Sequence, residues 1–378
     1  MASEQAVLDA HYMARAIELA RRGQYTTHPN PRVGCVIVRD GQVVGEGWHV
    51  RAGEGHAEVN ALRQAGELAR GATAYVTLEP CSHHGRTPPC ADALVNAGLA
   101  RVVAAMQDPN PQVAGRGLRR LNDAGIAVHS GVLEGEARAL NPGFLKRMEH
   151  GLPFVRVKLA MSLDGRTAMA SGESQWITGP AARSAVQRLR ARSSVVLTGA
   201  DSVLADGARM TVRASELGLD PEATALATER PPLRVLIDGR LRVPLDAPFF
   251  QAGSALVVTC PGSGAAARYQ QQGHELLEIA GPGGHVSLQA LLEALAARGA
   301  SEVLVEAGPT LAGAFAQAGL VDEYQIFVAA KFLGSSARPL LDWPLARMSQ
   351  APHLEIIEMR AVGADWRVIA VPAKAPSV

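Results

Sequence analysis

The first 150 residues alternate short apolar runs with segments whose apolar positions recur at helical spacing. The run VGCVIVRDGQVVGEGWH (33–49) predicts a hairpin that turns at Asp40-Gly41, a strong short-range turn signal. Buried strands are predicted at TAYVTLE (73–79), RVVAAM (101–106) and IAVHS (126–130), with helices near 56–69, 90–98 and 114–124. This alternation indicates a layered α/β domain.

The same alternation resumes after a break. A closing helix is predicted from Glu134 to about His150, and Gly151 and Pro153 interrupt its pattern before the strand FVRVKLAMS begins. Further strands are predicted within SSVVLTG (193–199), LRVLIDG (233–239), ALVVTC (255–260) and SEVLVEAG (301–308). We therefore expect two α/β domains, 1–150 and 151–378.

The net charge of the chain restricts the kinds of molecule that it is expected to bind. The 378 residues contain 37 Lys plus Arg and 36 Asp plus Glu, so no excess of positive charge is available for nucleic acid or an anionic membrane. The N-terminal segment carries Glu4, Asp9 and Glu18 in a pattern typical of an amphipathic helix, not of an export signal. No apolar run reaches the roughly 18 residues that a bilayer span needs. We expect a cytoplasmic protein with small-molecule partners, and self-association is left open.

The four cysteines fall into two groups. Cys35 and Cys260 stand in apolar runs and are interpreted as buried structural thiols. A reducing compartment does not favour a disulfide framework, so the close pair Cys81 and Cys90 indicates metal binding or catalysis.

His56, Cys81 and Cys90 supply three ligands of the kind that zinc prefers. A catalytic zinc keeps its fourth position for water, whose pKa it lowers from 15.7 to about 7. Glu58, two residues after His56, could then carry the proton from water to a leaving group. The pattern His-x-Glu, followed later in the chain by Pro-Cys, is the signature of zinc deaminases, in which the glutamate is the general acid and base.

An alternative is a closed structural zinc site, with His83 or His84 as the fourth ligand and Glu58 as a solvated helix residue. Closed sites usually have tight C-x-x-C spacing, whereas eight residues separate Cys81 from Cys90. That spacing also departs from the usual deaminase, and the insert could contribute Arg86 and a histidine to substrate binding.

Several motifs together resemble the bifunctional riboflavin-biosynthesis deaminase/reductase family. In the first half these are THPNPRVGCVIV, HAEVNAL, TLEPCSHHGRTPPC and DPNPQVAGRG, and the eight-residue insert matches that family. In the second half KLAMSLDGRTAMASGESQWITG, VLTGADSVLAD and VEAGPTLAGAF resemble the reductase. The resemblance implies a cytidine-deaminase-like three-layer domain and a dihydrofolate-reductase-like α/β domain. It also implies Zn²⁺ and NADPH, with deamination of a diaminopyrimidinone ribosylamine 5′-phosphate before reduction of its ribose to ribityl.

The strand-to-helix junction VEAGPTLAGAF has free backbone N–H groups that favour a phosphate. The pyrophosphate candidates there are Gly308, Thr310, Leu311, Ala312 and Gly313. Ordinary tight-packing glycines are the alternative, and the segment is not the G-x-G-x-x-G of a Rossmann domain.

Other reductase roles follow partly from side-chain chemistry and partly from the resemblance. Lys158 alternates with Val157 and Leu159, so it could enter the cleft and polarise the sugar oxygen, although most strand lysines face solvent. Arginines suit the substrate phosphate and Glu306 suits polar substrate groups. The expected substrate contacts are Ser174, Arg190, Arg213 and Glu306, and the expected cofactor contacts are Ala160, Trp176, Ser202 and Asp206. Where Gly207 and Ala208 stand, the resemblance leads us to expect aspartate and proline.

Asn30 in HPNPR and Asp108 and Asn110 in DPNPQ stand in proline-framed turns, which fix a side chain at little entropic cost. The resemblance implies that they shape the pyrimidine pocket, whereas taken alone they are typical turn and capping residues.

We hypothesise a zinc deaminase and NADPH reductase that acts on a phosphorylated pyrimidine. Two alternatives are kept. One is a nucleic-acid base deaminase with an appended domain, which the near-zero charge and the cysteine spacing disfavour. The other is a non-enzymatic zinc module with a nucleotide-sensing domain.

Overall fold

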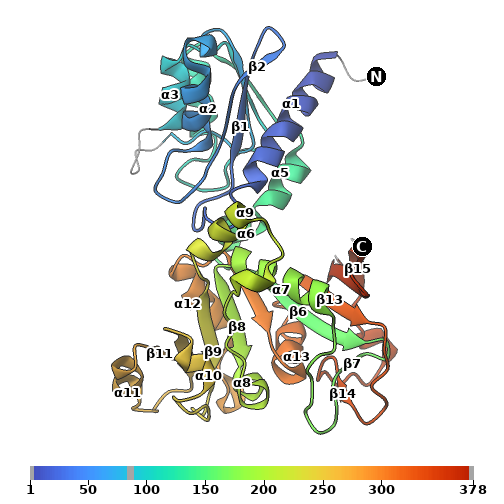
Figure 1. The fold of residues 1–378 in the computed structure, drawn as a ribbon. Coiled ribbons are helices and arrows are strands. Elements are labelled where there is room, and N and C mark those ends of the chain that lie inside the picture. The colour runs from blue at the N-terminus through green and yellow to red at the C-terminus, as the bar shows by residue number, and fades with distance from the viewer. Residues whose placement is uncertain (1–3, 83–88, 374–378) are drawn as a thin grey trace. The chain divides into compact units, whose positions relative to one another are not determined.

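The computed structural model describes residues 4–82 and 89–373. The chain divides into two compact units, Met1–Gly151 and Leu152–Val378, and the division lies one residue from the predicted boundary. Figure 1 shows both units and labels many of their helices and strands. Among the described residues, no helix is both long and apolar enough to span a membrane.

Unit 1 is built on a five-stranded sheet in the order β2-β1-β3-β4-β5. β1 is antiparallel to β2 and β3, whereas β3, β4 and β5 run parallel. The strands are β1 (Gly34–Arg39), β2 (Gln42–Trp48), β3 (Thr73–Val76), β4 (Arg101–Ala104) and β5 (Ala127–Ser130). The helices are α1 (Glu4–Arg21), α2 (Ala57–Ala65), α3 (Cys90–Asn96), α4 (Arg116–Asp123), α5 (Glu134–Leu140) and α6 (Pro142–His150), with a 3₁₀ turn at Gly66–Ala69.

Helices cover both faces of this sheet, which makes three layers (Figure 1). One core joins α1, α5 and α6 to one sheet face, and a second core joins α2, α3 and α4 to the other. Glycines let the helices approach closely. A Cβ added at Gly34 would lie 2.0 Å from the carbonyl oxygen of Ala16 in α1, and one at Gly47 would lie 2.3 Å from that of Ala57 in α2.

The predicted hairpin is confirmed, since β1 and β2 are joined at Asp40 and Gly41, whose φ angles are 50° and 75°. Two other predictions are wrong. The strand at 126–130 is not buried, because β5 is an edge strand with mostly exposed residues. The closing helix is two helices, α5 and α6. It breaks at Asn141 because Pro142 disfavours a helical conformation in the preceding residue, and because the Asn141 side chain bonds both backbone groups of Arg32.

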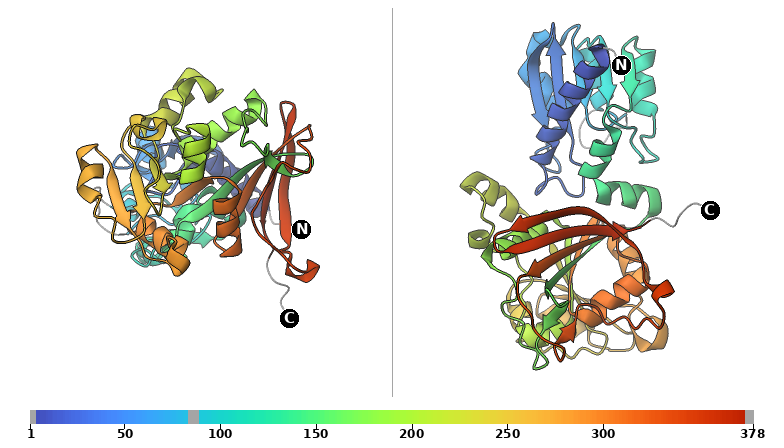
Figure 2. Two further views of the ribbon diagram at one scale, coloured as in Figure 1. Left: turned by 90° about the horizontal axis from the view of Figure 1, so that it is seen from below. Right: turned by 90° about the vertical axis from the view of Figure 1, so that its right-hand side faces the viewer.

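Unit 2 contains a nine-stranded sheet in the order β11-β10-β9-β8-β12-β6-β13-β16-β15. The strands from β11 to β13 in this order run parallel, and β16 and β15 complete one edge in antiparallel fashion (Figure 2). The strands are β6 (Phe154–Ser162), β8 (Val195–Gly199), β9 (Leu233–Ile237), β10 (Leu256–Thr259), β11 (Glu275–Glu278), β12 (Glu302–Glu306), β13 (Glu323–Ala329), β15 (Leu354–Val362) and β16 (Asp365–Pro372), with a small separate ladder of β7 (Arg166–Ala168) and β14 (Arg338–Pro339).

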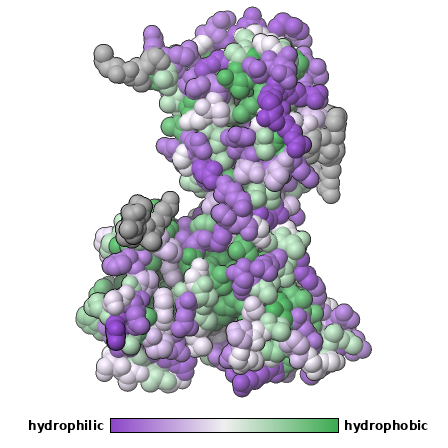
Figure 3. Space-filling model, turned by 180° about the vertical axis from the view of Figure 1, so that it is seen from behind, coloured by the Kyte–Doolittle hydropathy of each residue, from purple (hydrophilic) through white to green (hydrophobic). Residues whose placement is uncertain are grey.

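Two cores lie on opposite faces of this sheet. One contains α12 (Leu288–Ala297) and α13 (Pro309–Gln317). The other contains α7 (Pro180–Arg192), α8 (Ala200–Asp206), α10 (Pro248–Gln251) and α11 (Ala266–Gln271), while α9 (Pro221–Glu229) packs beside α7. Cys35 is buried as expected, but Cys260 is only half-buried, because it follows the end of β10 and contacts the loop at Gly284. The surface drawn in Figure 3 mixes polar residues with apolar patches, in keeping with the balanced composition.

Candidate functional site

The three candidate metal ligands of unit 1 meet at one point. His56 immediately precedes α2, Cys90 begins α3, and Cys81 lies in the loop after β3. His56 Nδ1 is 3.2 Å from Cys90 Sγ and 3.6 Å from Cys81 Sγ. All three ligand atoms lie within 4.8 Å of one another, so a single ion could contact them together.

The chemistry of this donor set fits zinc, which accepts imidazole nitrogen and thiolate sulfur. The ligand must be the thiolate. The hydrogen bond with Cys90, and further bonds with His56 and the Cys90 backbone, lower the pKa of the Cys81 thiol well below its usual range despite its burial. Cys81 is therefore ready to bind a cation at neutral pH.

Glu58 lies in the first turn of α2 beside these ligands and is almost fully buried. Burial raises the pKa of its carboxyl to about 7, and the nearby Cys81 adds to this effect. One oxygen, Oε2, has no hydrogen-bond partner in the described part of the chain. An unpaired carboxyl with a pKa near neutrality suits proton exchange with a ligand.

The proline-framed turns lie near the metal ligands. Asn30 Nδ2 is 3.1 Å from His49 Nε2, and the His49 ring lies 5.3 Å, centroid to centroid, from that of His56. Burial, and then the Glu79 and Cys81 charges, raise the pKa of Asp108 to about 6, against the effect of the hydrogen bond from the Asn110 N–H. The side-chain oxygen of Asn110 accepts a hydrogen bond from Gln112 N within the turn. Asn110 therefore also has the turn-stabilising role that is typical of an asparagine beside proline.

Glu79 was not predicted, although it directly precedes Pro80-Cys81. Its buried carboxylate accepts four backbone hydrogen bonds. The donors are Asp108 at 3.1 Å, Gly115 at 2.9 Å, Gly117 at 2.8 Å and Leu118 at 3.3 Å. The sequence signal for Glu79 was an acidic residue at the end of an apolar strand. The sequence could not show which groups bind its carboxylate, because they lie about thirty to forty residues further along the chain.

The same loop contacts the cysteine turn directly. A Cβ added at Gly117 would lie 1.9 Å from the Pro80 carbonyl oxygen, so glycine is required for this approach. Glu79 and Gly117 together join the Cys81 turn to the segment that carries Asp108. His83, His84 and Arg86, the candidates within the insert, lie outside the described residues.

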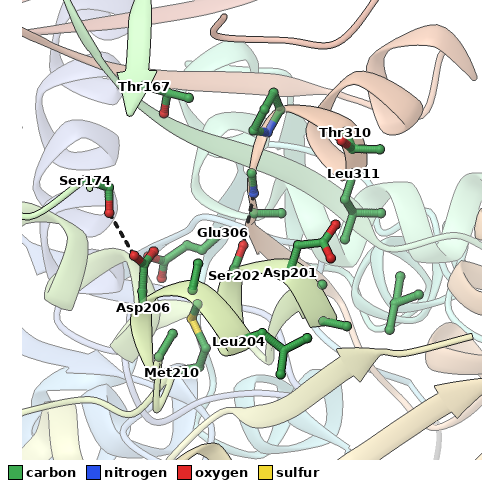
Figure 4. A pocket seen from close by; sticks show the side chains of 18 of the residues that line it. Thr167, Ser174, Asp201, Ser202, Leu204, Asp206, Met210, Glu306, Thr310 and Leu311 are labelled. Carbon is green, nitrogen blue, oxygen red and sulfur yellow. Dashed lines mark hydrogen bonds between the residues drawn. The ribbon is translucent and has the colours of Figure 1, made fainter. Parts of the chain in front are cut away.

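Unit 2 contains a cleft of about 1340 Å³ at the carboxyl ends of the parallel strands. Ligand pockets are typically about 300–1,000 Å³, so the cleft has room for a dinucleotide and a second small molecule. Twelve of the predicted residues line it, and ten of the lining residues are labelled in Figure 4. The twelve are Lys158, Ala160, Ser174, Trp176, Arg190, Ser202, Asp206, Arg213, Glu306, Gly308, Thr310 and Leu311.

Ala312 and Gly313 do not line the cleft. Ala312 belongs to the core, and its N–H donates to the Gly308 carbonyl oxygen as the first bond of α13. A Cβ added at Gly313 would lie 2.4 Å from the carbonyl oxygen of Asp342, so this glycine allows close packing. Only the first turn of a helix has free N–H groups, and Thr310 and Leu311 are placed there.

Lys158 and Glu306 face each other in the pairing of β6 with β12. Burial lowers the pKa of the Lys158 ammonium, and the neighbouring Glu306 opposes that change. Arg190 binds Glu306 through two hydrogen bonds, of 2.5 Å from Nε and 2.9 Å from Nη2. Arg190 also donates to the Thr211 carbonyl oxygen, so its guanidinium is largely engaged by protein groups instead of being free for a phosphate.

The loop residues of the cleft also contact one another. Ser174 Oγ donates to Asp206 Oδ1 at 2.8 Å, as the dashed line in Figure 4 marks. Trp176 is 58% exposed, and the Arg183 guanidinium lies 4.7 Å from its ring centroid. Gly207 stands where the family resemblance led us to expect an aspartate. It follows the last residue of α8 with a φ of 58°, a conformation that glycine adopts without steric cost.

Comparisons with known proteins assign a family model to each half of the chain. Residues 7–106 match the cytidine and deoxycytidylate deaminase zinc-binding region, and residues 153–368 match the RibD C-terminal domain. The chain is 56% identical over 367 residues to the riboflavin biosynthesis protein RibD of Escherichia coli (strain K12), covering 94% of this chain and 97% of that protein.

Solved structures extend the agreement to the fold. Acinetobacter baumannii RibD has a TM-score of 0.89 at 47% identity, covering 98% of this chain and all of that one. A Thermotoga maritima diaminohydroxyphosphoribosylaminopyrimidine deaminase/5-amino-6-(5-phosphoribosylamino)uracil reductase has a TM-score of 0.85 at 32% identity, with the same coverage. These likenesses confirm the predicted fold of both halves. The chain belongs to the RibD family of riboflavin biosynthesis proteins and is a bifunctional zinc-dependent deaminase and NADPH-dependent reductase.

Proposed function

We propose that residues 1–150 deaminate 2,5-diamino-6-(5-phosphoribosylamino)pyrimidin-4(3H)-one and that residues 151–378 then reduce the ribosyl group of the product to ribityl. The observation that carries this proposal is the pairing of two chemically different sites. Unit 1 has the His56, Cys81 and Cys90 ligand set beside a buried carboxyl, and unit 2 has a large cleft lined by a half-buried lysine, Lys158. The substrate class, a small phosphorylated pyrimidine, accords with both sites.

In the deaminase, a zinc ion held at this site would supply hydroxide near neutral pH, because zinc lowers the pKa of water to about 7. His56, Cys81 and Cys90 would hold the ion. Glu58 would accept the proton of the water and deliver it to the departing amino group, because its unpaired oxygen and raised pKa allow both protonation states near neutrality. Asn30, Asp108 and Asn110 would surround the pyrimidine ring.

In the reductase, NADPH supplies the reducing equivalents. Lys158 would donate a hydrogen bond and a proton to the sugar oxygen, which becomes a hydroxyl on reduction. Burial lowers the pKa of Lys158, and this eases release of its proton. Glu306 would hold substrate hydroxyl groups while Arg190 fixes its carboxylate in place.

The phosphate role that Arg190 was expected to play would fall to Arg213. Its side chain is 47% exposed and lines the cleft, and within the described part of the chain its ion pair is with Glu216, three residues later. Such exposed pairs contribute little, so the guanidinium is available to a ligand. The cytoplasmic location and any self-association stay predictions.

Two reciprocal variants test the proposal. Glu58→Gln retains the three metal ligands but cannot shuttle a proton, so ammonia release should fall by roughly 10²–10⁴-fold, whereas NADPH oxidation with already deaminated substrate should be close to wild type. Lys158→Met should show the opposite pattern. Loss of both activities in either variant would contradict the assignment of one reaction to each unit.

A further inference from the structure

Helix α6 is the last element of unit 1 and ends at His150, one residue before the end of that unit. Its place in the chain is that of a connecting segment, and it contains none of the candidate site residues. Phe144 and Leu145 of this helix are nevertheless buried, and they belong to the same core as α1 and one face of the sheet. α6 is therefore fixed within unit 1 and can hold other parts of it in place.

The segment that α6 contacts is the loop 28–32, HPNPR, which carries Asn30. Two of its five residues are prolines, which have no backbone N–H, so the loop has few donors with which to fix its own shape. The Asn30 N–H donates to the Thr27 carbonyl oxygen at 2.8 Å. Arg32 lies before β1 and outside the sheet, so strand pairing does not satisfy its backbone groups.

Asn141, the residue before α6, supplies partners for both of these groups. Its Oδ1 accepts a hydrogen bond from the Arg32 N–H at 2.7 Å, and its Nδ2 donates to the Arg32 carbonyl oxygen at 2.8 Å. The Arg32 guanidinium donates to the Leu140 carbonyl oxygen at 2.6 Å, at the C-terminal end of α5, where positive charge is favoured. Asn141 is buried. Its side chain thus pairs with the loop backbone as a neighbouring strand would.

A second contact holds the loop on the other side of Asn30. Arg147 of α6 donates from Nη2 to the Pro29 carbonyl oxygen at 3.2 Å. Asn30 therefore lies between two backbone positions that are both held from α6 or from the residue before it. Its side chain is directed toward the metal ligands, because Nδ2 contacts His49, whose ring lies beside that of His56.

We propose that Asn141 is a positioning residue of the deaminase, which fixes the loop that places Asn30 against the pyrimidine, and that Arg147 assists it. The inference rests on the proposed function, in which Asn30 contacts the ring. Asn141 bonds Arg32 with both polar atoms of its side chain, so it acts through the loop and not on the substrate. A shift of about 1 Å in a binding group can cost roughly a hundredfold in rate. The segment between the two units is thus a part of the deaminase site.

Hydrogen–deuterium exchange of the full chain, followed by mass spectrometry, tests this anchoring without substrate. Prolines carry no amide hydrogen, so a peptide over 28–33 reports mainly on the Asn30 and Arg32 N–H groups. Asn141→Ala removes both bonds to the Arg32 backbone and should speed exchange there by roughly 5- to 30-fold. Asn122→Ala is a matched control, which removes an exposed asparagine of α4 and should leave the exchange unchanged.

The kinetics of ammonia release test the effect on the site. Asn141→Ala should retain stoichiometric zinc and raise KM by roughly 10- to 100-fold with a much smaller change in kcat, because Asn30 binds the ring before as well as during the reaction. Asn30→Ala should raise KM similarly. If Asn141 acts through Asn30, the double variant should be no worse than Asn30→Ala alone. All three variants should reduce already deaminated substrate at the wild-type rate.

Arg147→Met keeps an apolar stem in α6 and should raise KM by a smaller factor, which keeps the inference testable if Asn141→Ala does not fold. Unchanged exchange in 28–33 would overturn the inference. So would a wild-type KM in Asn30→Ala, or losses that multiply in the double variant, since Asn141 would then not act through Asn30. If wild-type protein releases no ammonia from this substrate, the proposed function fails, and the exchange rates alone decide whether Asn141 holds the loop.

Discussion

Glu79→Gln tests whether the buried carboxylate before Cys81 holds the deaminase site together. Oε1 accepts hydrogen bonds from Gly117 and Leu118, and Oε2 accepts them from Asp108 and Gly115. Glutamine has the same size but only one acceptor oxygen. Whichever way its amide is turned, the NH₂ group faces two backbone N–H donors, which lose their acceptor.

The magnitude follows from those two orphaned donors. A buried N–H without a partner costs about 1–3 kcal/mol, so the variant should lose about 2–6 kcal/mol of stability. This is a large part of the roughly 5–15 kcal/mol that stabilises a typical domain. The loosened loop also carries Asp108, and so the KM for the deaminase substrate should rise in variant protein that still contains zinc.

Urea unfolding, followed by the near-ultraviolet circular dichroism of the full chain, measures the loss of stability, and metal analysis measures zinc. Glu67→Gln is a matched control, because this glutamate is exposed in the 3₁₀ turn after α2. Unchanged unfolding in Glu79→Gln would refute the account, since it would mean that water or rearranged loops satisfy the two donors. A normal KM in a destabilised variant would reduce Glu79 to a stabilising role alone.

Three further outcomes are expected. Cys81→Ser should lose zinc and ammonia release together, because a hydroxyl replaces the thiolate ligand poorly, and stoichiometric zinc in that variant would exclude Cys81 as a ligand. Gly47→Ala should lose at least about 1–3 kcal/mol in urea unfolding by displacing α2, whereas Gly135→Ala, with open space around its Cβ, should not. Burial alone would raise the pKa of Asp9, but the hydrogen bonds, from Arg101 first, lower it to about 2. The stabilisation of the folded chain by ionised Asp9 is therefore present above pH 3.8 and is lost as the pH falls toward 2. Asp9→Asn should reduce the pH dependence of the free energy of unfolding in that window.

The metal centre could be predicted because its signal is local. His56 and Glu58 share one helix start, and the residue types at Cys81 and Cys90 restrict the chemistry without any knowledge of the packing. The alternation of strands and helices likewise indicated two α/β domains. The C-terminal hairpin of β15 and β16 was not predicted, because β15 lies at the sheet edge and exposes nearly all of its side chains, so it lacks the apolar-in, polar-out alternation.

The reductase cleft was harder to predict because its decisive contacts join distant positions. Arg190 and Glu306 are 116 residues apart, and no periodicity in either segment indicates that the two side chains bind each other. Ala312 and Gly313 illustrate a different difficulty. A strand-to-helix junction predicts a phosphate site, but only the helical geometry shows that the free N–H groups end after the first turn.

Hydrogen-bond partners separate the groups that hold the sites from those that react. Glu79 is satisfied by four backbone N–H groups. Glu58 is also a glutamate and is as deeply buried as Glu79. One of its oxygens, however, has no hydrogen-bond partner among the described residues. A buried carboxylate that is fully bonded stabilises its charged form and its position, so it serves as scaffold. One that is left unsatisfied has its pKa moved toward neutrality and can exchange protons, which is why Glu58, and not Glu79, is expected to take part in the reaction.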